Sequence, residues 1–272
     1  MLPTDLQPDQ TPHRWDDHVL VYETVFEPFT LQFARKAITT LGLTAGASVL
    51  DVGAGSGGAA LAMAEQGLRV TAIDASPRMV ERLLARVAER NLPVDARPMD
   101  GQALQLDDAT FDAALSVLGV ILFPDAERGL AEMRRVVRPG GRVSVVTWTE
   151  PQNYELAAEL RAAVQAVCPE QPPAPLPAQL RYREEEDFRA LFEAAGLTEP
   201  EIVTMTAHLE AASARWLAEH IAFAPGMAAM MAGLGERAPA VVERLVGSLE
   251  ARQGTGPVRL SGVAFIGTAR VL

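Results

Sequence analysis

Residues 49–57 read Val-Leu-Asp-Val-Gly-Ala-Gly-Ser-Gly, an apolar strand with one acidic residue that leads directly into a glycine-rich turn. Such a turn lets the backbone come into van der Waals contact with a bound nucleotide, because no Cβ atom lies between them. Gly53, Gly55 and Gly58 also have the spacing of a dinucleotide-binding turn, so the glycines alone fit several adenosine-containing ligands. We expect Asp51, two residues before the first glycine, to decide among them.

Strands and helices alternate around this turn, which predicts a parallel, doubly wound α/β sheet. One helix has Ser76 as its cap and Pro77 at its first position, and Asp125 can cap the next, whose apolar face ends with Val137 before Pro139-Gly140-Gly141. The expected strands are rich in Val, Ile, Leu and Ala, as strands covered on both faces are. They are Ser48–Val52, Arg69–Ile73, Val94–Pro98, Phe111–Leu118 and Arg142–Trp148.

Two later segments, Glu201–Leu209 and Val258–Val271, show strand patterns and are expected to complete the sheet as an antiparallel final pair. The predicted fold is therefore a Rossmann-like, seven-stranded, mostly parallel sheet with an antiparallel last strand and helical cap additions. The expected organisation is a helical N-terminal extension (1–45), a nucleotide-binding core (46–150) and a C-terminal part (151–272) with cap segments 151–182 and 210–236.

Three flanking patterns leave alternatives open. In the N-terminal extension, Trp15, Val19, Tyr22, Phe26 and Phe29 recur at helical spacing, which favours a helix packed on the sheet. Residues 168–177 hold five prolines and predict a surface loop or stiff connector. The methionines between 227 and 231 fit ordinary packing or the lining of a pocket.

Composition excludes several functions. The chain has 24 Lys plus Arg against 35 Asp plus Glu, a net charge of −11, without a long basic cluster, which argues against nucleic acid as a partner. The single Cys168 cannot form an internal disulfide and has no CxxC neighbour, which fits a reducing compartment and argues against a zinc site. The sequence has no run of about 18 apolar residues, which is the length that a membrane span needs, and its first residues lack a leader pattern. We therefore expect a cytoplasmic protein.

Two acidic motifs follow the next strands. Ile73-Asp74-Ala75-Ser76 lies at the end of strand two, with Asp74 21 residues beyond Gly53, where a carboxylate can accept both ribose hydroxyls of an adenosine. Met99-Asp100-Gly101-Gln102-Ala103 follows strand three. Asp100 could accept from the adenine amine while Gly101 admits the ring edge, although a plain turn also uses Asp-Gly.

The fourth strand continues as Ser116-Val117-Leu118-Gly119-Val120-Ile121-Leu122-Phe123-Pro124-Asp125, and Glu132–Arg142 follows. Together, over about residues 48–150, these motifs resemble class I S-adenosylmethionine-dependent methyltransferases, especially the branch similar to ubiquinone- and menaquinone-biosynthesis enzymes that acts on small molecules. The sequence departs from these relatives at Leu104-Gln105-Leu106, where Leu-Pro-Phe is common. It also departs at Phe123, where a histidine often stands, which removes an obvious acid or base.

The resemblance implies S-adenosylmethionine as cofactor and S-adenosylhomocysteine as product, held by twelve residues. Backbone groups of the glycine turn would contact the methionine part, a carboxylate would hold its amino group, and the later motifs would hold the ribose, the adenine and the surroundings of the sulfonium. In that order the implied residues are Gly53, Ala54 and Gly55; Asp51; Asp74 and Ala75; Met79, Asp100, Gly101 and Gln102; and Ser116 and Val117.

The expected activity is in-line transfer of a methyl group to O, N or C of a small-molecule acceptor. A base for this step could be His18, Tyr22, His208 or His220, and no metal-ligand spacing is present. The flanking segments would form the acceptor pocket, with candidates Tyr22, Phe26, Phe123, Trp148, Trp216 and Phe223.

Two other functions stay open. One is an NAD(P)-dependent oxidoreductase, which usually has an apolar residue at the position of Asp51. The other is a protein that binds S-adenosylmethionine without transferring methyl. The sequence also leaves the oligomeric state open, with a homodimer as one option.

Overall fold

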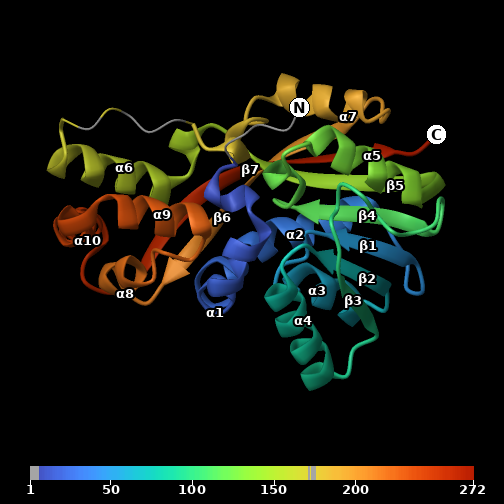
Figure 1. Ribbon diagram of the computed structural model, residues 1–272, viewed down its shortest axis with the longest axis horizontal. Helices are drawn as coiled ribbons and strands as arrows, with labels where there is room; N and C mark the ends of the chain where they lie inside the picture. Colours follow the sequence, from blue (N-terminus) through green and yellow to red (C-terminus); the bar gives the residue numbers. More distant parts are fainter. Residues whose placement is uncertain (1–5, 171, 173–175) are drawn as a thin grey trace.

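The computed structural model describes residues 6–170, 172 and 176–272, and its centre is a seven-stranded sheet in the order β3-β2-β1-β4-β5-β7-β6 (Figure 1). The strands β1 to β5 pair in parallel, whereas β7 runs antiparallel to both β5 and β6. The predicted Rossmann-like sheet with an antiparallel last strand is therefore confirmed. The strands are β1 (Ser48–Val52), β2 (Arg69–Asp74), β3 (Val94–Pro98), β4 (Phe111–Val117), β5 (Val137–Trp148), β6 (Glu201–Ala211) and β7 (Val258–Arg270).

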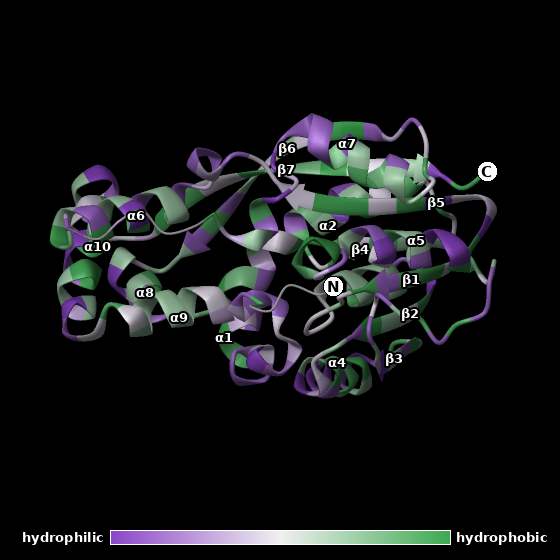
Figure 2. Ribbon diagram, turned by 45° about the horizontal axis from the view of Figure 1, so that its top comes forward, coloured by the Kyte–Doolittle hydropathy of each residue, from purple (hydrophilic) through white to green (hydrophobic). Residues whose placement is uncertain are grey.

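Helices cover the sheet because its central strands bury both faces, and Figure 2 shows these strands mostly in hydrophobic colours. The predicted caps are confirmed: the Ser76 side chain accepts from the Met79 N–H, and Asp125 accepts from the Arg128 N–H. The helices around the core are α2 (Glu27–Leu41), α3 (Gly58–Glu65), α4 (Pro77–Arg90), α5 (Ala126–Val136) and α7 (Glu185–Ala194).

The start of β5 differs from the prediction. The helix α5 ends at Val136, and Val137 already pairs with Phe111 of β4, so the strand begins before Arg142. The pairing shifts register between Phe111 and Ala113, and Gly140 has a φ of +81°. A Pro-Gly-Gly sequence that stops a helix is equally suited to an irregular strand, because glycine adopts positive φ without steric cost.

A second group of helices lies beyond one end of the sheet, at the left of Figure 1. We call α6 (Glu155–Val167), α8 (Ala214–Glu219), α9 (Pro225–Gly233) and α10 (Ala238–Gln253) the helical lobe. The part of the lobe inserted between β6 and β7 runs from α8 to the end of α10 at Gln253 and contains most of the expected cap segment 210–236. Within the proline-rich stretch, residues 171 and 173–175 lie outside the described residues, so the predicted connector is not tested there.

The chain before α2 is not one continuous helix. After the 3-10 turns Pro8–Gln10 and Pro12–Asp17 come the short helix α1 (Val19–Val21) and a π-helical turn over Tyr22–Phe26, which leads directly into α2. In Figure 1 this part lies between α4 and the helical lobe. Of the helices in the described parts of the chain, none is both long and apolar enough to cross a membrane.

Candidate functional site

The glycine turn after β1 meets the loop after β4. Gly53 and Gly55 have φ values of +71° and +55°, which favour glycine at both positions. A Cβ atom on Gly53 would lie 3.0 Å from the Cα of Gly119, and a Cβ on Gly119 would lie 2.9 Å from the carbonyl oxygen of Val52. Gly119 was not among the predicted site residues. Its sequence signal is a glycine placed directly after an expected strand.

We expect Gly119→Ala to lower the free energy of unfolding by about 1–3 kcal/mol, because the added methyl group meets backbone atoms that cannot rotate away. The measurement is urea denaturation of the ligand-free protein. Gly247→Ala is the control, because a Cβ atom there meets nothing within 4 Å and lies inside α10. Equal urea midpoints for Gly119→Ala and wild type would show that the glycine turn and the loop after β4 can move apart without a loss of stability.

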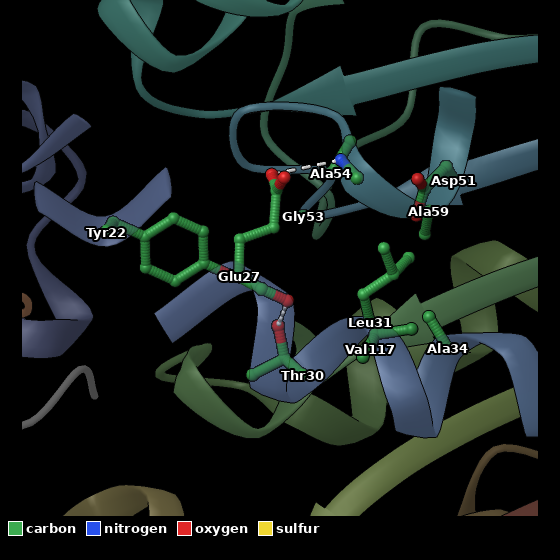
Figure 3. A pocket seen from close by; sticks show the side chains of 11 residues that line it. Tyr22, Glu27, Thr30, Leu31, Ala34, Asp51, Gly53, Ala54, Ala59 and Val117 are labelled. Atoms are coloured by element: carbon green, nitrogen blue, oxygen red, sulfur yellow. Dashed lines mark hydrogen bonds between the residues drawn. The ribbon is translucent and has the colours of Figure 1, made fainter. Parts of the chain in front are cut away.

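Asp51 is buried at the end of β1 and lines a pocket that is partly open to solvent (Figure 3). Its Oδ2 atom is buried and has no hydrogen-bond partner among the described residues. Burial, followed by the negative charge of Asp74, raises the pKa of Asp51 to about 7. An orphaned carboxylate oxygen in a pocket calls for a donor from a ligand, and a cationic donor suits it best.

Asp74 lies at the end of β2, as predicted, and its carboxylate supports the glycine turn. Its Oδ2 accepts from the Gly55 N–H and its Oδ1 accepts from the Ser76 N–H, both at 2.8 Å. Burial raises the pKa of Asp74, and these two hydrogen bonds oppose the rise. Each carboxylate oxygen has two lone pairs, so the group can still accept from a ligand.

A buried ion pair, absent from our predictions, holds the other side of the turn. Both amino groups of Arg86 donate to Glu27 at 2.8 Å, and both residues are only 7% exposed. Glu27 Oε2 also accepts from the Ser56 hydroxyl at 2.5 Å and from the Gly58 N–H at 3.1 Å. The carboxylate of Glu27 therefore occupies the N-terminal end of α3, where the helix dipole favours negative charge.

Further contacts attach residues 7–26, which we call the N-terminal segment, to the core. The Ser76 hydroxyl donates to Asp16 at 2.5 Å. Arg82 of α4 donates twice to Glu23, at 2.6 and 2.8 Å. These bonds fix the segment along α4.

The same segment also contacts the helical lobe. Asp9 Oδ1 accepts from the Gly226 N–H at 2.7 Å at the start of α9. The Nδ1 atom of His18 lies 2.9 Å from the carbonyl oxygen of Ala222. The N-terminal segment thus connects the core to the lobe through side chains on both sides.

The predicted adenine-side residues lie around the loop after β3. The backbone and side-chain N–H groups of Gln102 donate to Asp100, and its Oε1 accepts from the Asp125 N–H. A Cβ atom on Gly101 would lie 2.5 Å from the ring of Phe123. That ring also packs against Gly129, so Phe123 fills space beside the loop and α5, apart from the other expected acceptor-pocket residues.

The remaining predicted cofactor contacts lie close to the turn. Met79 is buried in the first turn of α4, and Ala75 connects β2 to that helix. The Ser116 hydroxyl donates to the Val52 carbonyl at 2.7 Å and accepts from the Val120 N–H at 3.0 Å, so it joins β4 to β1. Val117, in contrast, lines the pocket.

Four of the six expected acceptor-pocket residues, Tyr22, Phe26, Trp148 and Phe223, belong to one group of packed rings. Phe26 stacks on Phe223 with 4.6 Å between ring centroids and contacts Tyr22 edge-on at 5.9 Å. Phe29 and Tyr154, which were not among the expected acceptor-pocket residues, also belong to this aromatic cluster, and Tyr154 stacks on Trp148 at 5.3 Å. Trp216 stacks instead on His220.

Of the four candidate bases, only Tyr22 lines the pocket. His220 Nδ1 lies 2.8 Å from the carbonyl oxygen of its neighbour Trp216, and His18 contacts the lobe. His208 lies on β6, where its backbone bonds to the Gln32 side chain. Over residues 6–170, 172 and 176–272, no group of three or more His, Cys, Asp or Glu side chains is placed to hold a metal ion.

Part of this chain is similar in sequence to known proteins. The family model of a methyltransferase domain matches residues 50–145. An uncharacterized protein of Mycobacterium tuberculosis is 34% identical over 161 residues, and the match spans 59% of this chain and 57% of the relative. A demethylmenaquinone methyltransferase of Tropheryma whipplei is 38% identical over 120 residues, which are 44% of this chain and 49% of that protein.

Among solved structures, a SAM-dependent methyltransferase from Aquifex aeolicus is similar, with a TM-score of 0.53 and 17% identity. The similarity covers 88% of this chain and 89% of that one, and it supports the fold. This fold, the family match and the orphaned carboxylate beside the glycine turn agree with the resemblance seen in the sequence. Residues 50–145 therefore match the methyltransferase-domain family, and the seven-stranded sheet that contains them agrees with that match.

Proposed function

We propose that this chain binds S-adenosylmethionine and transfers its methyl group to a small-molecule acceptor. The observation that carries the proposal is the Oδ2 atom of Asp51, a buried carboxylate oxygen without a partner in a pocket at the end of β1. The α-amino group of S-adenosylmethionine is a cationic donor of the kind that this oxygen lacks. The neighbouring Gly53 and Ala54 line the same pocket.

The position of Glu27 argues against the nicotinamide alternative. In dinucleotide-binding proteins of related fold, the pyrophosphate lies at the N-terminus of the helix that follows the glycine turn. Here that end of α3 already holds the carboxylate of Glu27, which accepts from the Gly58 N–H. A pyrophosphate at this place would meet a buried carboxylate, an unfavourable contact between like charges.

The remaining cofactor assignments follow the strand ends. In this proposal Asp74 accepts the ribose hydroxyls, with Ala75 and Met79 nearby. Asp100, Gly101 and Gln102 surround the adenine, and Ser116 and Val117 flank the sulfonium. The hydroxyl of Ser116 is engaged with backbone groups, so it would contribute shape and Val117 would contribute direct contact.

The acceptor half of the site would come from the flanking segments. Residues 1–45, 151–182 and 210–236 are proposed to cover the strand ends of the core 46–150. The aromatic cluster borders the cofactor pocket through Tyr22, which suits an apolar acceptor. The name of the T. whipplei relative supports a small molecule as acceptor.

S-adenosylmethionine would supply an electrophilic methyl group on a cationic sulfur. The protein's contribution is to orient the acceptor in line with that group and to exclude water. Phe123 cannot serve as acid or base, and the three candidate histidines lie outside the pocket lining. An acceptor whose reacting atom needs little deprotonation fits this arrangement best.

Calorimetric titration tests the cofactor. We expect wild type to bind S-adenosylhomocysteine and not NAD, and Asp74→Asn to bind S-adenosylhomocysteine about tenfold more weakly, because a charged acceptor is replaced by a neutral one. Asp95→Asn on the exposed edge strand β3 serves as control and should bind like wild type. Binding of NAD without S-adenosylhomocysteine would overturn the proposal.

Methyl transfer itself needs a second measurement. Incubation with methyl-labelled S-adenosylmethionine and fractionated metabolite extracts should give a labelled product. A protein that binds the cofactor but labels nothing across a wide panel would instead be a binding protein that does not transfer methyl.

A further inference from the structure

The pocket at the glycine turn is rich in carboxylates. Asp51 and Glu27 line it, and Asp74 lies on the neighbouring strand end. The guanidinium of Arg86 is bound to Glu27 and to the Ser56 carbonyl oxygen. An α-amino acid group needs hydrogen-bond acceptors for its ammonium and donors for its carboxylate. The carboxylates of this pocket can accept from the ammonium, whereas donors for the carboxylate must come from neutral groups.

Two side chains in the pocket lining carry hydroxyl donors, Tyr22 and Thr30. The Thr30 hydroxyl donates to the backbone oxygen of Glu27 at 3.2 Å, within its own helix. Figure 3 shows Tyr22 entering the pocket from the N-terminal segment, on the side opposite Asp51. Tyr22 is thus the side-chain donor of this lining whose hydroxyl bonds to no backbone group of the described residues, and its side-chain partner is Thr30.

The ring of Tyr22 lies against the glycine turn. A Cβ atom on Gly55 would lie 3.6 Å from the Cε1 atom of Tyr22 and 3.9 Å from its hydroxyl oxygen. Trp15 contacts the same ring edge-on at 5.9 Å, and the Tyr22 N–H donates to the His18 carbonyl at 2.8 Å. These contacts place the hydroxyl at the turn without any contribution from the core strands.

The chemical state of Tyr22 suits a donor. Burial, followed by the charge of Glu27, raises the pKa of the Tyr22 hydroxyl far above its ordinary value. The group therefore keeps its proton at any pH at which the protein would work. A phenol in this state donates a hydrogen bond and is poorly suited to act as a base.

We propose that Tyr22 binds the α-carboxylate of the cofactor as its hydrogen-bond donor, opposite Asp51, which binds the ammonium. This assignment rests on the proposed function and moves Tyr22 from the acceptor side of the site to the cofactor side. It also gives the N-terminal segment a defined role, because the segment carries the donor that the core does not provide. Recognition of the amino acid end then depends on residues far apart in the sequence.

Isothermal titration of the cofactor-free protein tests the assignment with two probes. One is S-adenosylhomocysteine and the other is its decarboxylated analogue, which keeps the amine. We expect Tyr22→Phe to weaken S-adenosylhomocysteine about fivefold and to leave the affinity for the decarboxylated analogue unchanged. Tyr182→Phe, which removes a hydroxyl outside the pocket lining, is the matched control and should change neither affinity.

Each outcome has a separate meaning. If Tyr22→Phe weakens both probes equally, or neither, the hydroxyl does not bind the carboxylate and the assignment is overturned. If wild type binds neither probe, the proposed function itself fails. Should Tyr22→Phe not fold, the wild type alone decides: equal affinity for the two probes would show that the carboxylate has no donor in this site.

Discussion

Replacing Arg86 by methionine is expected to lower the free energy of unfolding by about 3–5 kcal/mol, because Glu27 would then be a buried carboxylate without its cation. Both side chains are only 9% exposed, so solvent cannot replace the lost guanidinium. The substitution also removes the donor to the Ser56 carbonyl oxygen in the glycine turn. Urea denaturation followed by circular dichroism measures the loss.

Two further variants test whether the uncompensated charge of Glu27, and not simply the loss of an arginine from α4, lowers the free energy of unfolding. Arg82→Met, one turn earlier, breaks a pair whose side chains are 28% and 20% exposed, and we expect it to cost at most about 1 kcal/mol. The double variant Glu27→Gln with Arg86→Met should regain much of the stability, since a neutral amide replaces the buried charge. If the double variant is as unstable as Arg86→Met alone, the uncompensated charge is not the cause.

Asp51→Asn is expected to weaken binding of S-adenosylhomocysteine by about 2 kcal/mol at pH 8, because the ammonium loses a charged acceptor. Wild-type affinity should fall about tenfold between pH 8 and pH 6, since the pKa near 7 means that Asp51 must lose a proton to bind a cation. Titration calorimetry at several pH values measures both effects. A wild-type affinity that is flat over this range would contradict the role of Asp51.

Folding of the ligand-free protein favours the protonated form of the Asp51 carboxyl, whereas binding of the cofactor needs the ionised form. Its pKa is raised on folding from 3.8 to about 7, so the folded state holds the proton more tightly than the unfolded state. The stability that this provides is complete below the unfolded pKa and is lost as the pH rises through about 7. In Asp51→Asn this part of the pH dependence of unfolding should disappear, while the rest stays.

The core was predictable because its signals are local. The glycine turn, Asp74 at the end of β2 and the caps Ser76 and Asp125 each depend on residues within one strand and the helix that follows. The exception within the core is β5, where Pro139-Gly140-Gly141 fits a helix stop and an irregular strand equally well. The partner that decides between them, Phe111 of β4, is distant in sequence.

The flanks were less predictable because their partners are remote. The spacing of Trp15, Tyr22 and Phe26 predicts one helix, yet the structure divides this stretch into 3-10 turns, α1 and a π-helical turn. Here contacts with α4 and with the helical lobe outweigh local helix preference. Glu27 was missed for the same reason: a glutamate in an amphipathic helix looks solvated until Arg86 of α4 is placed beside it.

The position of β7 has a consequence for how the chain is made. This strand lies between β5 and β6, and among the described residues β6 pairs with no other strand. During synthesis, β6 and the helices after it leave the ribosome before the strand that joins them to the sheet exists. Until then β5 and β6 both present unpaired edges, which are prone to association with other chains. Nascent chains stalled before residue 258 should therefore depend most on protection by chaperones.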